Sequence, residues 1–91
     1  MPPMSEGEVA KHLKLVPGWS LKDGKLFKHF EFKDFKESMM FVNKVADIAE
    51  AEGHHPNISI SYNKVDITLF THAVKGLSTN DFILAAKIDT I

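Results

Sequence analysis

The chain has 91 residues, a formal net charge of −1 and an apolar fraction of 44%, which together predict one domain over residues 1–91 with a single core. A near-neutral charge without lysine or arginine clusters argues against direct binding of nucleic acid. Because the sequence contains no cysteine, disulfides, zinc–thiolate sites and a cysteine nucleophile are excluded. No apolar run approaches the ~18 residues of a membrane span, and the N-terminus lacks a signal-peptide pattern. We therefore expect no membrane partner and a cytoplasmic location, with the nucleus as a second compartment.

The N-terminal third predicts a short helix followed by a β-hairpin. Ser5 with Glu8 three residues later fits a capping box, which predicts a helix over about residues 6–15. Residues 19–21 and 25–32 flank an Asp-Gly turn and predict two paired strands. Phenylalanine occurs on both faces of the second strand, so the pattern alone leaves its inward face undecided.

The longest predicted helix covers residues 35–52. Asp34 precedes it as a candidate N-cap, and Gly53 follows it where a left-handed glycine would end the helix. Apolar residues recur at helical spacing along one stripe, and four more lie off that stripe. The stripe is Phe35, Met39, Val42, Ala46 and Ala49, and the others are Met40, Phe41, Val45 and Ile48. Since one sheet covers one side of a helix, this surplus predicts association with a second subunit through residues 35–52. The alternative is a helix that sinks deeper into its own core.

The C-terminal part predicts a second hairpin and a last helix. Strands are expected over residues 57–62 and 65–71, joined by a turn at Asn63-Lys64, because apolar and polar residues alternate in both. Ser78 with Asp81 three residues on predicts the start of the last helix. The order α-β-β-α-β-β-α indicates an α+β fold, a single four-stranded antiparallel sheet with helices packed on one face.

The titratable side chains concentrate in one stretch, from Glu50 to Asp81. It contains the adjacent pair His54-His55 and, after the second hairpin, His72. Because a hairpin brings the residue before its first strand close to the residue after its second, we expect His55 near His72 at one end of the sheet. The two acids bracket the set, and Asp81 is expected either to orient an imidazole or to serve only as an acid at a helix N-terminus.

Three interpretations compete for these histidines. One is structural, since a histidine at a helix end often caps carbonyl groups. The second is zinc or iron binding by three imidazoles and a carboxylate, although adjacent histidines in an extended segment seldom reach one ion together. The third is acid–base catalysis on a bound small molecule, which needs two proton-transfer groups on opposite sides of a pocket and no metal. The third interpretation fits best and predicts a cavity between the imidazoles. His12 and His29 lie outside this set and are expected to be surface or sheet-face residues.

A spaced signature in this stretch resembles that of the pterin-4a-carbinolamine dehydratases. It reads Glu50-x3-His54-His55-Pro56-x5-Tyr62-x9-His72-x8-Asp81. Flanking segments agree, namely Pro-Gly-Trp at 17–19, Phe-x-Phe-Lys-Asp-Phe at 30–35, and Thr-His at 71–72 followed by Gly-Leu-Ser at 76–78. The resemblance covers nearly the whole chain. It implies a small cytoplasmic α+β protein that associates as a dimer or tetramer through the long central helix.

The resemblance implies a specific reaction, the dehydration of 4a-hydroxytetrahydrobiopterin (the 4a-carbinolamine) to quinonoid dihydropterin and water. This hydro-lyase (carbon–oxygen lyase) step regenerates tetrahydrobiopterin for the aromatic amino acid hydroxylases. The resemblance assigns proton transfer to His54 and His72 and substrate holding mainly to His55, with Glu50 and Asp81 orienting the imidazoles or the bound ring. It implies neither a metal nor a cofactor. The implied substrate-binding positions are Gly53, His54, His55, Pro56, Thr71, His72 and Ala73.

The resemblance also implies a rival function. Some members act as dimerisation cofactors of a homeodomain transcription factor, which they bind through the central helix, so that the catalytic residues would be idle. A third alternative is a pterin-related enzyme that serves no hydroxylase, for example in molybdopterin metabolism. Two positions depart from the family pattern, since Gly53 stands where many relatives carry an acid and Asn80 stands where animal members often carry arginine. Neither departure removes a proton-transfer group, but both bear on substrate affinity or assembly.

Overall fold

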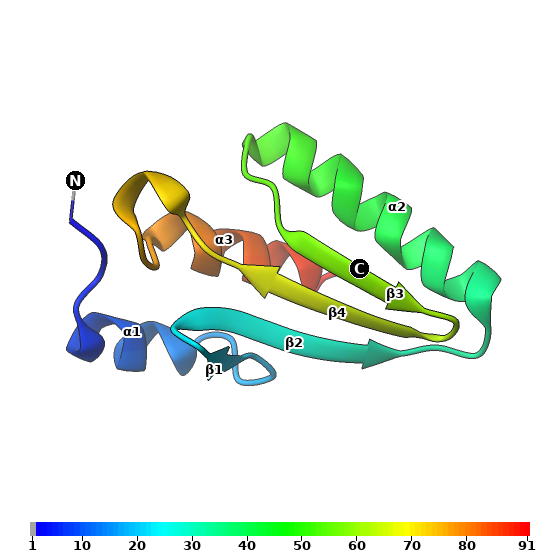
Figure 1. Cartoon of the computed structure of the whole chain (residues 1–91), viewed down its shortest axis with the longest axis horizontal. Helices are drawn as coiled ribbons and strands as arrows, with labels where there is room; N and C mark the ends of the chain where they lie inside the picture. Colours follow the sequence, from blue (N-terminus) through cyan, green and yellow to red (C-terminus); the bar gives the residue numbers. More distant parts are fainter. Residues whose placement is uncertain (1) are drawn as a thin grey trace.

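The computed structural model describes residues 2–91, which form one sheet and three α-helices (Figure 1). The order of the expected elements is confirmed, and a short 3₁₀-helix is added after the last strand. None of the described helices is long and apolar enough to cross a membrane. The elements are α1 (Glu6–Leu13), β1 (Ser20–Lys22), β2 (Lys25–Glu31), α2 (Phe35–Glu52), β3 (Asn57–Ser61), β4 (Lys64–Leu69), η1 (His72–Val74) and α3 (Thr79–Ile88).

The four strands form a single antiparallel sheet in the order β1-β2-β4-β3. Each hairpin pairs within itself, and β2 joins β4 with Leu26 opposite Leu69 and Phe30 opposite Val65. The sheet therefore has β2 and β4 at its centre, while β1 and β3 are its free edges. The predicted α+β class and the four-stranded antiparallel sheet are confirmed.

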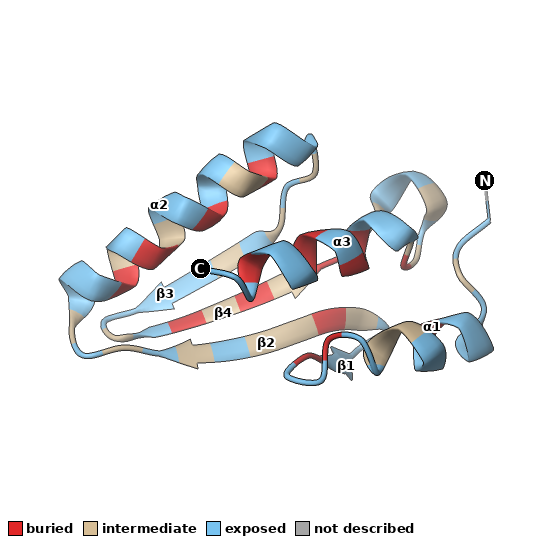
Figure 2. Cartoon of the chain, turned by 180° about the vertical axis from the view of Figure 1, so that it is seen from behind, coloured by how far each residue is buried: buried red, intermediate tan, exposed pale blue. Residues whose placement is uncertain are grey.

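One face of the sheet is covered by helices and the other is open. Leu26, Val65, Ile67 and Leu69 are fully buried and pack with residues of α3 in the core. Figure 2 shows α3 in front of β4 on this side, with buried positions on both elements. This settles the inward face of β2, which carries Leu26 and its alternate neighbours. We call the opposite side the open face. It carries Ser20, Lys22, Lys25, Phe27, His29, Glu31, Lys64, Asp66, Thr68, Asn57, Ser59 and Ser61.

Helix α2 begins and ends where the sequence predicts. The Asp34 carboxylate accepts a hydrogen bond from the Glu37 amide at 2.9 Å, and Gly53 ends the helix with a left-handed φ of 64°. The predicted apolar stripe is not the buried one, however. Among its five members only Ala49 is buried, whereas Phe35 is half exposed. The side of α2 that faces the core carries Ser38, Phe41, Val45 and Ala49.

The turn of the second hairpin lies one residue earlier than predicted. Strand β3 ends at Ser61 and β4 begins at Lys64, so Tyr62 and Asn63 form the turn. Tyr62 adopts a positive φ of 54°, a conformation that side chains other than glycine and asparagine seldom adopt. The side-chain amide of Asn63 donates to the Phe32 carbonyl at 3.1 Å, which ties this turn to the end of β2.

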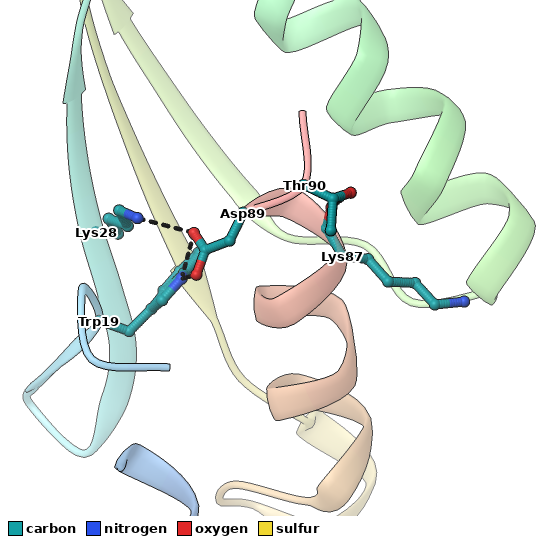
Figure 3. Close-up of polar contacts among 5 residues, drawn as sticks. All are labelled: Trp19, Lys28, Lys87, Asp89 and Thr90. Atoms are coloured by element: carbon teal, nitrogen blue, oxygen red, sulfur yellow. Dashed lines mark hydrogen bonds and ion pairs between the residues drawn. The ribbon is translucent and has the colours of Figure 1, made fainter. Parts of the chain in front are cut away.

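The C-terminal end of α3 is bound to the first hairpin through Asp89 (Figure 3). Its two carboxylate oxygens each lie 3.1 Å from the indole nitrogen of Trp19, and one of them lies 2.8 Å from the Lys28 ammonium. Trp19 is 4% exposed and belongs to the core. The C-terminal helix is thereby held to the N-terminal hairpin on the covered side of the sheet.

Candidate active site

His54 lies immediately after the end of α2, where the left-handed Gly53 redirects the chain. Its amide donates to the Ala49 carbonyl at 3.1 Å, so the residue stays attached to the last turn of the helix. Its side chain is 16% exposed, and Nε2 lies 2.5 Å from an oxygen of Asp81, whose own side chain is fully buried. The imidazole is therefore anchored from α3, by a residue 27 positions further along the chain.

The Asp81 carboxylate is the centre of this site. One oxygen contacts His54 Nε2, and the other accepts from the Thr71 hydroxyl at 2.8 Å and from the Ser78 amide at 2.9 Å. The Thr71 and Ser78 hydroxyls also lie 2.8 Å apart. The two roles considered for Asp81 are thus both present, since it orients an imidazole and also accepts a backbone amide at the start of α3.

The hydrogen bonds assign the tautomer of His54. A carboxylate is only an acceptor, so Nε2 carries the hydrogen of the 2.5 Å contact. The other ring nitrogen, Nδ1, has no hydrogen-bond partner within residues 2–91 and has a free lone pair. An aspartate behind a histidine holds the ring in one orientation and stabilises the imidazolium that forms when the free nitrogen takes a proton.

His72 is the first residue of η1, in a tight loop after β4. The loop is closed by Thr71 and Gly76, whose backbone groups exchange hydrogen bonds at 3.0 and 3.4 Å. The His72 side chain is exposed and packs against Phe70, with ring centroids 5.2 Å apart and an interplanar angle of 76°. Within the described part of the chain, no hydrogen bond occupies its ring nitrogens.

His55 has a different partner from His54. Its Nε2 lies 2.7 Å from the Glu50 carboxylate, and the two side chains are 64% and 76% exposed. Exposed ion pairs of this kind contribute little to stability. The predicted proximity of Glu50 to the histidines is therefore found for His55, whereas Asp81 serves His54.

The structure joins some of the predicted residues and leaves others apart. Asp81 connects His54 to Thr71 and so to the segment that carries His72. No hydrogen bond or ring contact joins His55 to His72 within residues 2–91. Gly53, Pro56 and Ala73 lie next to these histidines in the chain. Thr71 was expected as a substrate-binding position, but the contact of its hydroxyl with Asp81 was not predicted, and Ser78 was predicted only as a helix cap.

The cavity expected between the imidazoles is neither of two hollows that lie elsewhere in residues 2–91. One, of about 490 Å³, lies between the N-terminal residues, α1 and the β1–β2 hairpin, and another, of about 250 Å³, lies beside α2 and Ile91. Neither is lined by a histidine. Within residues 2–91, no three histidine, aspartate or glutamate side chains are grouped to hold a metal ion. His12 and His29 lie outside the site, on Phe82 and beside Asp66 respectively.

Comparison with known proteins places the chain in a family. Residues 2–91 match the model of the pterin 4 alpha carbinolamine dehydratase family. A relative from Nitrosospira multiformis, provisionally assigned as a pterin-4-alpha-carbinolamine dehydratase, is 46% identical over 91 residues, which are 100% of this chain and 80% of the relative.

Two solved structures share the fold. The crystal structure of a transcriptional coactivator/pterin dehydratase from Brucella melitensis superposes with a TM-score of 0.91 at 34% identity, covering 97% of this chain and 96% of that one. A pterin dehydratase-like protein identified as a RuBisCO assembly factor in the alpha-carboxysome superposes with a TM-score of 0.65 at 29% identity, covering 79% and 83%. On the match of residues 2–91 and the 46% identity to a curated relative, the chain belongs to the pterin 4 alpha carbinolamine dehydratase family.

Proposed function

We propose that this protein dehydrates 4a-hydroxytetrahydrobiopterin to quinonoid dihydropterin and water, in the recycling of tetrahydrobiopterin. Membership of the dehydratase family supports the reaction class. The observation that carries the proposal is that His54 is held through Nε2 by the buried Asp81 carboxylate while its Nδ1 has no hydrogen-bond partner within residues 2–91, so that one nitrogen of an oriented imidazole is left for proton transfer.

The reaction requires one acid and one base. Hydroxide leaves poorly, so an acid must protonate the C4a oxygen, and water departs as the C4a–O bond breaks. A base takes the proton from the neighbouring ring nitrogen, and its electrons form the C=N bond. The total number of protons on the enzyme is unchanged, because one is given to the oxygen and one is taken from the nitrogen, and exchange with water then returns the acid and the base to their starting states.

We assign the base to His54 and the acid to His72. The free Nδ1 of His54 accepts a proton while Asp81 stabilises the resulting imidazolium. His72, exposed and free of hydrogen bonds to described groups, is available to give a proton to the departing oxygen. His55, paired with Glu50, holds the substrate. Every step uses side chains of this chain, and none requires a metal or cofactor.

The test is the dehydration rate of freshly generated 4a-carbinolamine with the wild type and with each histidine changed to alanine. A proton-transfer group typically contributes 10²–10⁴-fold, so His54→Ala and His72→Ala should each lower kcat by on the order of 100-fold or more. His55→Ala should act mainly on KM. His12→Ala serves as the matched control, because its ring lies on Phe82, outside the site. Wild-type kcat in both the His54 and His72 variants would refute the mechanism.

We also propose that the protein forms a homo-oligomer through α2 and the neighbouring edge of the sheet. Phe35 is 50% exposed on α2, and the half-buried Met39 and Val42 extend the same stripe. Strand β3 is a free edge, and Ile60 on it is 37% exposed. An uncovered edge strand beside an apolar helix flank is the kind of surface that a second copy covers, because a twofold interface is self-complementary. Binding of a transcription factor by the same helix is the second candidate function, suggested by the coactivator description of the Brucella structure.

Oligomer formation and dehydration can be separated by substitution. Val42→Glu places a charge on the helix flank and should convert the oligomer to monomer in light scattering coupled to size exclusion. His72→Ala should lower the dehydration rate and leave the oligomer intact. Lys36→Glu, at an exposed position of α2, is the control for the added charge. A wild type that is monomeric at micromolar concentration would exclude the homo-oligomer.

A further inference from the structure

We propose that Lys25 is a specificity-determining residue of this site, and that it favours pterins carrying an anionic substituent such as a carboxylate or a phosphate. The proposal rests on the proposed pterin site and names the class of substrate it prefers. It follows from the position of Lys25 on the open face of the sheet, from its neighbours and from the lack of a counter-ion among the described residues.

Lys25 reaches the site across the strand pairing. It is the first residue of β2 and precedes Leu26, whose partner on β4 is Leu69. Continuing this register by one residue sets Lys25 beside Phe70, and its ammonium lies 5.2 Å from the Phe70 ring centroid. The lysine thus comes from the first hairpin, far in sequence from the histidines, to the end of the second hairpin.

The Phe70 ring also contacts the imidazole of His72, the proposed acid. The His72 ring lies 5.2 Å from the Phe70 ring centroid, so Phe70 contacts both the ammonium and the imidazole. The ammonium and the imidazole are therefore at most about 10 Å apart. A substituent on a ring bound at His72 can reach Lys25, whereas the C4a atom is handled by the histidine.

The charge around Lys25 is unbalanced. Lys22 lies directly opposite Lys25 in the β1–β2 pairing, and like charges at directly opposed positions destabilise a sheet. The Lys22 ammonium lies over Phe27, 4.7 Å from the ring centroid. No ion pair within residues 2–91 involves either lysine, and Asp23 in the intervening turn does not pair with them.

An anion between these lysines would relieve their repulsion. Each cation is held over an aromatic ring, an interaction that fixes its position without neutralising its charge. Elsewhere on the open face, the carboxylates of Asp66 and Glu31 contact His29, and Glu31 also lies opposite Lys64 in the strand pairing. Two acids thus stand against one histidine and one lysine there, so the excess of positive charge is local to the end of the sheet where His72 lies. The observations therefore point to an acidic group on the ligand.

The test measures binding of two oxidised pterins, 6-carboxypterin and the neutral 6-hydroxymethylpterin, by isothermal titration. The wild type should bind the carboxylate on the order of fivefold more tightly, the factor that an exposed ion pair supplies at its upper limit. Lys25→Met keeps the aliphatic stem over Phe70 and removes the charge, so it should abolish the preference and leave the affinity for the neutral pterin unchanged. Lys25→Arg should retain the preference.

Lys64→Met is the matched control, because Lys64 lies on the same face at the other end of β4. It should keep the preference for the carboxylate. High salt should weaken that preference in the wild type, since exposed charges are screened. Equal affinity for the two probes in the wild type, no binding of either, or a preference that survives Lys25→Met would each overturn the proposal.

An absence of dehydratase activity can be distinguished from an absence of the selectivity proposed for Lys25. A wild type that discriminates the two probes through Lys25 but does not dehydrate the carbinolamine refutes the enzymatic function and leaves the selectivity standing. A wild type that dehydrates the carbinolamine but binds both probes equally refutes the role of Lys25 and leaves the enzyme standing.

Discussion

At the scale of single residues, Asp81 determines what the site can do. Its carboxylate is fully buried and accepts hydrogen bonds from the His54 ring, the Thr71 hydroxyl and the Ser78 amide. Buried polar groups that lose a partner cost about 1–3 kcal/mol each, so the network fixes the imidazole more firmly than a surface contact would. His55 with Glu50 is the counterexample, exposed and easily rearranged.

Asp81→Asn should show whether Asp81 acts on catalysis through His54 or only through the stability of the fold. The amide keeps the size of the side chain but no longer stabilises an imidazolium, so kcat should fall on the order of 100-fold or more while KM changes less. The measurement is steady-state kinetics together with thermal unfolding. Asp34→Asn changes the N-cap acid of α2, away from the histidines, and should leave kcat unchanged. A normal kcat in Asp81→Asn would show that His54 needs no orienting charge.

At the scale of elements, the pairing of β2 with β4 contains a pH-sensitive contact. His29 on β2 lies opposite Asp66 on β4, with 2.5 Å between Nδ1 and the carboxylate. The hydrogen bond from His29 to Asp66, and then that to Glu31, raises the pKa of His29 above its ordinary value of 6.5. A pKa that is higher in the folded than in the unfolded protein stabilises the folded state by an amount fully present below pH 6.5. That contribution is lost as the pH rises through the folded-state pKa.

His29→Gln should therefore lower the melting temperature below pH 6.5 and have little effect in alkaline buffer. The measurement is thermal unfolding monitored by circular dichroism across this range, at low salt because the pair is exposed and screened. When the same substitution is made in an Asp66→Asn background, most of its pH-dependent effect should vanish. A destabilisation by His29→Gln that grows toward alkaline pH would contradict the raised pKa.

The helices show where pattern reasoning succeeds and where it fails. Both ends of α2 were predicted, because Asp34 and Gly53 act through local backbone geometry. The buried side of α2 was not, because two apolar stripes lie side by side on this helix and periodicity does not say which one faces the sheet. The turn after β3 was misplaced by one residue, since Tyr62 takes a positive φ that its residue type does not favour.

At the scale of the whole molecule, the four-stranded sheet and its helix-covered face followed from sequence, and the family signature also implied that Asp81 orients an imidazole, but which imidazole it holds did not follow. The link from His54 to Asp81 depends on how α3 packs against the end of α2. Hairpin geometry predicted that His55 would lie near His72 at one end of the sheet, and the side-chain contacts that the structure gives are those of His55 with Glu50 and of His72 with Phe70. The contact of Lys25 with Phe70, on which the proposed selectivity rests, did not follow from sequence because it is made by β2–β4 pairing, which no local pattern encodes.

The contact of Asp89 with Trp19 and Lys28 holds the last helix to the first hairpin (Figure 3). Asp89→Ala leaves the indole N–H of Trp19 without its acceptor in a partly buried position, which should cost about 1–3 kcal/mol. For a domain of this size, each kcal/mol lowers the melting temperature by about 4–8 °C. Thermal unfolding followed by tryptophan fluorescence measures the loss. Asp47→Ala, at an exposed acid on α2, is the control, and an equal effect of both substitutions would show that the contact is not stabilising.

Asp81 has a structural role at the start of α3 and a proposed role in orienting His54, and this affects how activity can be inferred for relatives. The Asp81 carboxylate both stabilises the start of α3 and orients the His54 ring. A relative that has lost the activity would still be stabilised by this aspartate, so the presence of the aspartate alone is poor evidence for catalysis. His72 has no comparable structural role, because its exposed ring makes no hydrogen bond or ring contact within residues 2–91 other than the one with Phe70. Drift at the histidine, with the aspartate retained, would mark descendants that have become scaffolds.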